Sequence, residues 1–265
     1  FHCSRREYLY GLGSSLGALA MTDLLAGETI SPLAPKKPMH QPSAKAVIML
    51  FMEGGPSQVD TFDPKPLLDR DHGKPLPFPL PKITFAKQGN LFKSPWKFHR
   101  HGESGLPVSE LFPQIAQHVD DLCILRSVHG TNPAHGAASL RLHTGADQFV
   151  RPSMGSWITY GLGSENENLP AFITICPTLA HGGVNNWGAS FLPSHCQGTP
   201  IGNASIPASK AGFKHITNDR LSAAQQRQQL QLLSELNQNF NQSNNHNSIL
   251  EDRLKSFELA YRMQT

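Results

Sequence analysis

Residues 47–66 read VIMLFMEGGPSQVDTFDPKP, an unbroken apolar run that passes into an acid, two glycines and two aspartates. An apolar run without polar alternation predicts a strand that is buried on both faces, as in a parallel sheet. Ligands of such sheets bind beyond the carboxyl ends of the strands, which is where Glu53, Asp60 and Asp63 follow the run. Carboxylates at a strand end can hold a cation through oxygen. The alternative is a plain turn, in which Asp63 accepts backbone hydrogen bonds before a proline.

The segments that follow alternate between apolar runs and helical spacing. Further buried strands are predicted at residues 122–128 and 169–176. Helices with an N-terminal serine or a C-terminal glycine signal are predicted at residues 107–121, 134–145 and 154–163, and the last of them ends at Gly161 or Gly163. This order of elements predicts an α/β protein in which helices flank a mostly parallel sheet.

Two amphipathic helices are predicted near the end of the chain, over residues 221–240 and 248–263. Their apolar residues recur at three- and four-residue spacing, and an Asn-rich turn separates them. The polar faces carry Gln and Asn rather than Lys, so the apolar stripe indicates packing rather than membrane binding.

The composition excludes some classes of function. A net charge of +3, dispersed over 265 residues, argues against a nucleic-acid partner. The 4 cysteines form no CxxC pair, although Cys176 and Cys196 could form a disulfide in an oxidising compartment. The 13 histidines are notable because histidine is the commonest metal ligand and a proton carrier near neutral pH.

The N-terminus has the layout of an export signal. Residues 4–9 read SRREYL, and a short apolar run rich in Gly, Ala and Ser follows. The adjacent arginines are similar to a twin-arginine signal; the alternative is an ordinary amphipathic helix. We therefore predict a signal segment at residues 1–27, a linker at 28–45, and a domain at 46–265. The twin-arginine export machinery would be a partner, and the mature protein would be periplasmic or extracellular.

A second polar cluster surrounds a predicted strand-to-helix junction, in the stretch SVHGTNPAHGAASLRLHTG at residues 127–145. A helix that begins near His135 would direct backbone N–H groups at an anion. His129 and His135, on either side of a loop, could share a metal ion, and Glu53 and Asp60 are further candidate ligands.

A third polar cluster lies in a glycine-rich stretch at residues 181–200, HGGVNNWGASFLPSHCQGTP. Polar side chains there stand beside aromatic and glycine residues, which is typical of a binding loop. The candidate substrate-binding residues are Asn132 of the second cluster and His181, Asn185 and His195 of the third.

Four phrases together resemble a bacterial family known as domain of unknown function 1501: SRREYL, GGPSQVDTFDPKP, NPAHGAASLRLHTG and GASFLPSHCQGTP. The family is abundant in planctomycetes, often carries a twin-arginine leader, and is classed with the alkaline-phosphatase and sulfatase superfamily. Its members are typically longer. The resemblance therefore implies the N-terminal part of an alkaline-phosphatase-like domain, whose C-terminal half would be a partner and would supply the remaining metal ligands.

The superfamily resemblance also implies roles for particular residues. A divalent metal ion, such as zinc or calcium, would be bound at strand ends, with Glu53 or Asp60 as the first ligand. On the sulfatase spacing, the nucleophile position falls on His135, which is not Ser, Thr or Cys. Thr131 could be the nucleophile only if the loop is longer. His135 would then be a metal ligand or a general base.

These features lead to a hypothesis and two alternatives. The hypothesis is an exported metal-dependent hydrolase-like protein that acts on phosphate or sulfate esters, of a small molecule or a polysaccharide. The first alternative is a catalytically inactive alkaline-phosphatase-like protein with a binding or surface-associated role. The second is an incomplete domain, in which an open sheet exposes apolar edges.

Overall fold

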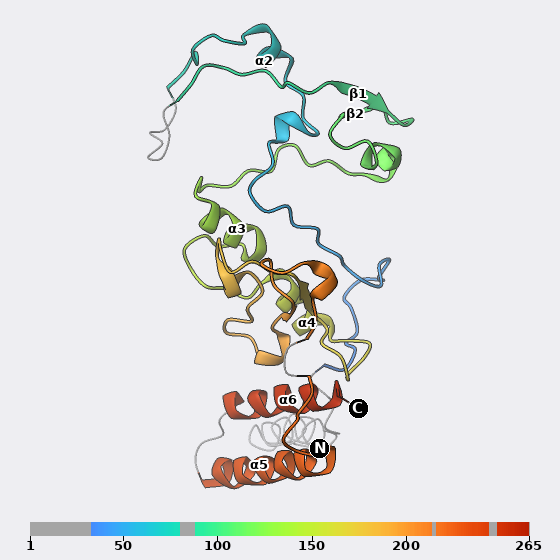
Figure 1. Ribbon diagram of the computed structural model, residues 1–265, viewed down its shortest axis with the longest axis vertical. Helices are drawn as coiled ribbons and strands as arrows, with labels where there is room; N and C mark the ends of the chain where they lie inside the picture. The colour runs from blue at the N-terminus through green and yellow to red at the C-terminus, as the bar shows by residue number, and fades with distance from the viewer. Residues whose placement is uncertain (1–32, 80–87, 214–215, 244–247, 265) are drawn as a thin grey trace, which may run out of the picture. The chain divides into compact units, whose positions relative to one another are not determined.

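The computed structural model describes residues 33–79, 88–213, 216–243 and 248–264 (Figure 1). The chain divides into two compact units. One consists of residues 46–131, and the other combines the described residues before Ala46 with those from Asn132 onward. The predicted signal segment, residues 1–27, lies outside the described residues. In the described part of the chain, no helix is long and apolar enough to cross a membrane.

The unit of residues 46–131 is built around an antiparallel hairpin of β1 and β2 (Figure 1). Its core is formed by Val108, Ala116 and Val119. The Asp120 carboxylate accepts hydrogen bonds from the backbone N–H groups of the hairpin loop. The elements are η1 (Gln58–Asp60), α2 (Pro66–Arg70), β1 (Phe98–His101), β2 (Leu106–Ser109) and η2 (Ile115–Asp121).

The second unit contains a short parallel pair, β3 (Ile173–Ile175) with β4 (Thr199–Ile201). Four α-helices and three 3₁₀-helices accompany this pair in the described residues (Figure 1). The helices are α3 (His135–Thr144), α4 (Met154–Leu162), η3 (Gly183–Asn186), η4 (Ser194–Cys196), η5 (Ala208–Lys210), α5 (Ala223–Ser243) and α6 (Ser248–Arg262).

The helices predicted at residues 134–145 and 154–163 are confirmed as α3 and α4. Each ends at a glycine with positive φ, Gly145 at 77° and Gly163 at 73°. Glycine adopts this left-handed conformation at little cost because it has no Cβ. At Gly163 a Cβ would also overlap the backbone of Ala34, so this position requires glycine for steric reasons too.

The beginning of α4 is fixed by a buried network of hydroxyl groups. The hydroxyls of Ser153 and Ser156 lie 2.9 Å apart, and the Ser156 hydroxyl donates to the carbonyl of Gly188 at 3.0 Å. The Ser153 N–H donates to the same carbonyl, also at 3.0 Å. Since both serines are fully buried, these bonds hold the first turn of α4 against the segment around Gly188.

The two amphipathic helices predicted near the C-terminus are confirmed as α5 and α6. Leu254 of the predicted apolar stripe of α6 is buried, whereas Phe257 of the same stripe is 55% exposed. The Ser194 hydroxyl of η4 donates to the carbonyl of Asp252, which attaches η4 to α6. Most of the Asn-rich turn between the helices lies outside the described residues.

The strand predictions need correction. Residues 46–52 and 122–128 form no strand, and their apolar side chains are largely exposed. The strand predicted at residues 169–176 is only the short β3. A buried parallel strand needs a hydrogen-bonded neighbour on each side. Among the described residues no strand pairs with 46–52 or 122–128, because the only strand pairs are β1–β2 and β3–β4. The architecture is a mixture of helices and small sheets, which is α/β in the coarse sense.

The prediction of a helix at residues 107–121 is also wrong for its first half, and the second half forms the 3₁₀-helix η2. Ser109, which the sequence predicts as the N-cap, instead ends β2. Helical structure begins only at η2, and His118 interrupts it with non-helical dihedral angles. Pro113 accounts for the late start, because proline lacks an N–H group and disfavours helical geometry in the preceding residue.

Candidate functional site

The N-terminus of α3 begins at His135, as the sequence predicts. The preceding residue, Ala134, is the N-cap and provides no side-chain hydrogen bond to the first turn. The Asn132 side chain instead accepts from the Ala134 N–H at 3.0 Å and shapes the loop before the helix. A first turn without a side-chain cap leaves backbone N–H groups that an anion can accept from.

His181 lies beside His135 at this helix terminus. The centroids of the two imidazole rings are 5.2 Å apart, and the ring planes are tilted by 31°. Both residues are exposed. A Cβ added to Gly136 would lie 3.7 Å from the Cα of His181, so the loop that carries His181 packs closely on the first turn of α3. The structure thus brings together His135 of the second polar cluster and His181 of the third.

The backbone holds His181 in an uncommon conformation, with φ at 50°. A residue with a Cβ pays a steric cost in the left-handed region, and such residues concentrate at functional sites. The buried Asn186 side chain donates to the carbonyl of His181 at 3.0 Å and keeps the loop in this shape. Asn186, rather than Asn185, is therefore the residue that positions the loop.

Sequence reasoning did not assign that positioning role to Asn186. Its buried Oδ1 has no hydrogen-bond partner. The predicted binding residue Asn185 is half-buried, and its backbone N–H donates to the carbonyl of Gly182 at 3.3 Å. The only signal for Asn186 in the sequence is the pair of asparagines after two glycines, and that pair does not show which side chain turns inward.

His195 lies in η4, where its side chain is only 6% exposed. Its Nδ1 atom is 3.7 Å from Oδ1 of Asp252 on α6, and it has no hydrogen-bond partner. Burial lowers the pKa of His195, whereas the negative charge of Asp252 opposes that shift. A side chain enclosed in this way is shielded from a dissolved ligand in this structure.

The other predicted site residues belong to the unit of residues 46–131. Glu53, His129 and Thr131 are exposed, and Asp60 is half-buried at the end of η1. Nδ1 of His129 lies 3.4 Å from its neighbouring backbone carbonyl at Ser127. In the part of the chain that the structure describes, no group of three or more His, Cys, Asp or Glu residues could hold a metal ion.

Asp63, the other carboxylate in the opening stretch, is paired within the same unit. It is buried, and its carboxylate lies 2.6 Å from the Lys65 ammonium and 3.8 Å from the Arg126 guanidinium. The turn alternative predicted that Asp63 accepts backbone hydrogen bonds, whereas the structure pairs its carboxylate with two cationic side chains.

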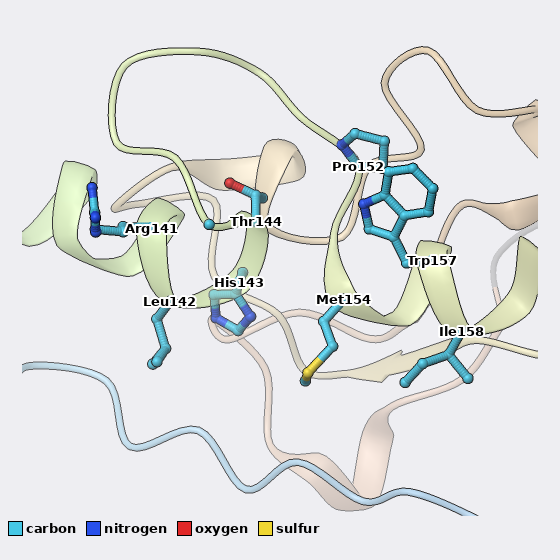
Figure 2. A pocket seen from close by; sticks show the side chains of 9 residues that line it. Arg141, Leu142, His143, Thr144, Pro152, Met154, Trp157 and Ile158 are labelled. Carbon is cyan, nitrogen blue, oxygen red and sulfur yellow. The ribbon is translucent and has the colours of Figure 1, made fainter. Parts of the chain in front are cut away.

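A cleft of about 470 Å³ lies between the last turn of α3 and the first half of α4 (Figure 2). Burial lowers the pKa of His143 in its wall. The cleft is lined by Arg141, Leu142, His143, Thr144, Gly145, Pro152, Met154, Trp157 and Ile158. Sequence reasoning treated these helices as elements of the fold and did not predict a cleft between them.

The cysteines Cys123, Cys176 and Cys196 are free thiols, so the disulfide between Cys176 and Cys196 that the sequence left open is not formed. Cys196 is buried, and burial raises the pKa of its thiol to about 11. A thiol with so high a pKa carries little thiolate at neutral pH and is a poor nucleophile.

Comparison with known proteins gives one family match. The family model described as "Protein of unknown function (DUF1501)" matches residues 44–265. No curated protein and no solved structure matches the chain. Since the family match spans most of the 265 residues, the chain belongs to the DUF1501 family of proteins of unknown function.

Proposed function

We propose that this protein is an exported hydrolase-like protein acting on phosphate or sulfate esters, and that the ester oxyanion binds at the N-terminus of α3. The observation that supports the proposal most directly is the 5.2 Å separation of the His135 and His181 rings beside that terminus. Imidazole N–H groups and the first-turn amides are all hydrogen-bond donors, and they suit the oxygen atoms of a phosphoryl or sulfuryl group.

The two histidines have distinct roles in this proposal. His135 belongs to the helix and would act as a general base or as a metal ligand, while His181 would orient the oxyanion from the opposite loop. The backbone of the His181 loop lies against the first turn of α3 at Gly136, and the two rings are adjacent without a ligand. Such preorganisation reduces the cost of ordering side chains when the ligand binds. Thr131 remains the proposed alternative nucleophile.

The part played by a metal ion rests on the family resemblance. A bound divalent ion, zinc or calcium, would polarise the ester oxygen. The proposed ligands are Glu53, Asp60, His129 and His135, but no group of three such side chains is assembled among the described residues.

The proposal includes an architecture and a location that the same resemblance suggests. The chain would form the N-terminal part of an alkaline-phosphatase-like domain with a mostly parallel sheet. The C-terminal half would be its intramolecular partner, and a small-molecule or polysaccharide ester would be its substrate. The twin-arginine-like segment supports export to the periplasm or beyond.

The second candidate function is a binding protein without catalysis. It is favoured by the residue at the expected nucleophile position, which is His135 rather than Ser, Thr or Cys. A helix terminus with two imidazoles would still bind an anion in that case. Turnover of an ester, and not binding alone, separates the two candidates.

The first experiment is elemental analysis of the full-length exported protein, together with calorimetric titration of inorganic phosphate and sulfate. His135→Ala and His181→Ala are the test variants, and His99→Ala, an exposed histidine of the other unit, is the matched control. Stoichiometric metal lost in His135→Ala, with hydrolysis of nitrophenyl phosphate or sulfate, would support the hydrolase. Anion binding that depends on both histidines, without turnover, would support the binding protein. Unaltered behaviour in both variants would refute both functions at this site.

A further inference from the structure

Helix α4 is inverted relative to an ordinary surface helix, because it buries its polar side chains and exposes its apolar ones. Ser153 at its N-cap, Ser156 and Thr159 are almost fully buried. A surface helix of a folded domain normally turns its apolar residues to the core. In α4 the large apolar residues are instead each at least 37% exposed: Met154, Trp157, Ile158, Tyr160 and Leu162. The apolar side of α4 is therefore a candidate interaction surface.

Hydrogen bonds at both ends of α4 fix this orientation. At its start, the Ser156 hydroxyl donates to the carbonyl of Gly188 at 3.0 Å. At its end, the backbone N–H of Lys36 donates to the carbonyl of Leu162 at 2.9 Å. Rotating the helix to bury its apolar side would break these bonds and leave buried polar groups unsatisfied. The exposure of the apolar side is thus a fixed feature of this unit.

The α4 face, by which we mean the five exposed residues of the helix together with Leu142 and Phe191, forms one continuous apolar surface. Leu142 of α3 lines the same depression as Met154, Trp157 and Ile158 (Figure 2). The ring of Phe191, which is 70% exposed, lies 5.9 Å from the ring of Trp157. Since one aromatic side chain can bury roughly 150–250 Å², the exposed fractions of the face amount to roughly 600 Å². This is at the upper end of the ~300–600 Å² of the largest apolar patch on a typical monomer.

The α4 face combines a projecting group with a hollow. Trp157 and Gly161 are four residues apart, so they lie about one turn, ~6 Å, apart on the same side of the helix. The indole of Trp157 is large, and the residue is 47% exposed. At Gly161, no atom in the described part of the chain lies within 4 Å of the position that a Cβ would occupy. When two such helices pack antiparallel, the projecting indole of each lies opposite the hollow of the other.

The charges around the α4 face favour a neutral partner. The helix has the sequence MGSWITYGL, which contains no charged side chain. The ammonium group of Lys36, at the edge of the face, donates to the carbonyl of Tyr160 at 2.6 Å and lies 5.1 Å from the centre of the Tyr160 ring. Recognition of an anionic lipid surface relies on clusters of Lys and Arg, which the face lacks. A second copy of the same uncharged face would pair with it without charge repulsion.

We propose that two copies of this chain associate through the α4 face, with their α4 helices antiparallel about a two-fold axis near Thr159. Trp157 of each copy enters the hollow at Gly161 of the partner subunit. The contact closes after two copies, because the same surface contributes both the projecting group and the hollow. Burial of ~600 Å² on each copy approaches the ~800 Å² per partner of a standard interface. His135 and His181 are not part of the α4 face, so this proposal does not rest on the proposed ester site.

The test is sedimentation equilibrium of the full chain over a wide range of protein concentrations. We expect a reversible change in mass from one chain to two. Trp157→Ala removes the projecting group and Gly161→Leu fills the hollow, so each should weaken dimerisation by roughly tenfold or more. Gly161→Leu also introduces a better helix former, so α4 should remain folded. Trp96→Ala is the matched control, since Trp96 is 43% exposed and belongs to the other unit.

Mixing the two variants separates loss of this contact from loss of structure. In a mixed pair, the indole of the Gly161→Leu copy meets the open hollow of the Trp157→Ala copy, and the two substituted positions meet each other. The mixture should therefore recover dimers that neither variant forms alone at the same concentration. Circular dichroism and thermal melting show whether each variant is folded.

A wild-type chain that stays monomeric at every concentration would overturn the proposal. If that monomer binds phosphatidylglycerol vesicles through Trp157, the face belongs to a lipid surface and not to a second copy. Dimers that Trp157→Ala and Gly161→Leu leave unchanged would overturn the proposal as well. So would a mixture of the two variants that is no more dimeric than its components.

Discussion

Nδ1 of His195 on η4 lies 3.7 Å from Oδ1 of Asp252 on α6, in a place where the histidine side chain is only 6% exposed. This separation is too long for a hydrogen bond, and the buried nitrogen has no other partner. Burial lowers the pKa of His195 from its ordinary value of 6.5, and the nearby ammonium groups of Lys255 and Lys36 act in the same direction. The negative charge of Asp252 acts in the opposite direction and raises the pKa of His195. Burial thus favours the neutral form of His195 between η4 and α6.

Acidification is expected to destabilise the folded chain through this residue. The unfolded chain gains a proton near pH 6.5, whereas the folded state resists protonation of His195 until a lower pH. The stability contributed by the neutral imidazole is complete above pH 6.5 and is lost as the pH falls below it. Urea unfolding at about pH 7.5 and about pH 5.5 measures the loss, which should be smaller in His195→Gln. The control, His99→Gln, alters an exposed histidine. An identical pH dependence in His195→Gln and wild type would contradict this account.

Replacing either of two glycines near the end of α4 by alanine should change the stability of the folded chain, but in opposite directions. Gly163 has φ at 73° and its Cβ would overlap the backbone of Ala34, so Gly163→Ala is expected to destabilise by ~1–3 kcal/mol or more. Gly161 lies within the helix with no atom close to its Cβ position, so Gly161→Ala should stabilise by ~0.5–1 kcal/mol. Chemical denaturation of both variants provides the comparison. Stabilisation by both would show that the contact with Ala34 is readily displaced.

Interrupting the buried hydroxyl network of Ser153 and Ser156 should lower the stability of the folded chain. Ser156→Ala removes the donor to the Gly188 carbonyl and the partner of the Ser153 hydroxyl. The Gly188 carbonyl still accepts from the Ser153 N–H, but the buried Ser153 hydroxyl loses its acceptor, which is expected to cost ~1–3 kcal/mol, whereas Ser205→Ala at an exposed position should change stability by less than ~0.5 kcal/mol. Thermal or urea unfolding tests the difference. A neutral Ser156→Ala would mean that water or a shifted backbone replaces the lost bonds.

The backbone strain at His181 predicts a conflict between stability and binding. His181→Gly and His181→Ala both remove the imidazole, but only glycine relieves the positive φ of 50°. The glycine variant should therefore be more stable than the alanine variant by ~1 kcal/mol, while both lose phosphate binding. Unfolding and calorimetry on the same two proteins measure these effects separately. Equal stability of the two variants would argue against a strained backbone at this position.

Local signals in the sequence were sufficient to predict α3, α4, α5 and α6. Gly145 ends α3 as the sequence predicts, Gly163 ends α4 where the sequence left Gly161 or Gly163 open, and α5 and α6 follow from their apolar periodicity. A helix makes its backbone hydrogen bonds within one segment, so its residues carry most of the information needed to predict it.

The sheet structure and the candidate sites could not be predicted from local signals in the sequence. The run at residues 47–52 has the composition of a buried strand, yet it has no strand partner among the described residues and remains exposed. Strand pairing requires hydrogen bonds from a distant segment, which composition does not specify.

The sequence by itself determined the family of this chain, the positions of α3, α4, α5 and α6, and the polar clusters around His135 and His181. Only the tertiary structure decided that these two histidines meet, because the loop that carries His181 packs on the first turn of α3 and is held in shape by the Asn186 hydrogen bond. The same holds for the cleft beside Trp157. Contacts between residues far apart in the chain depend on how whole elements pack, and neither spacing nor propensity encodes that packing.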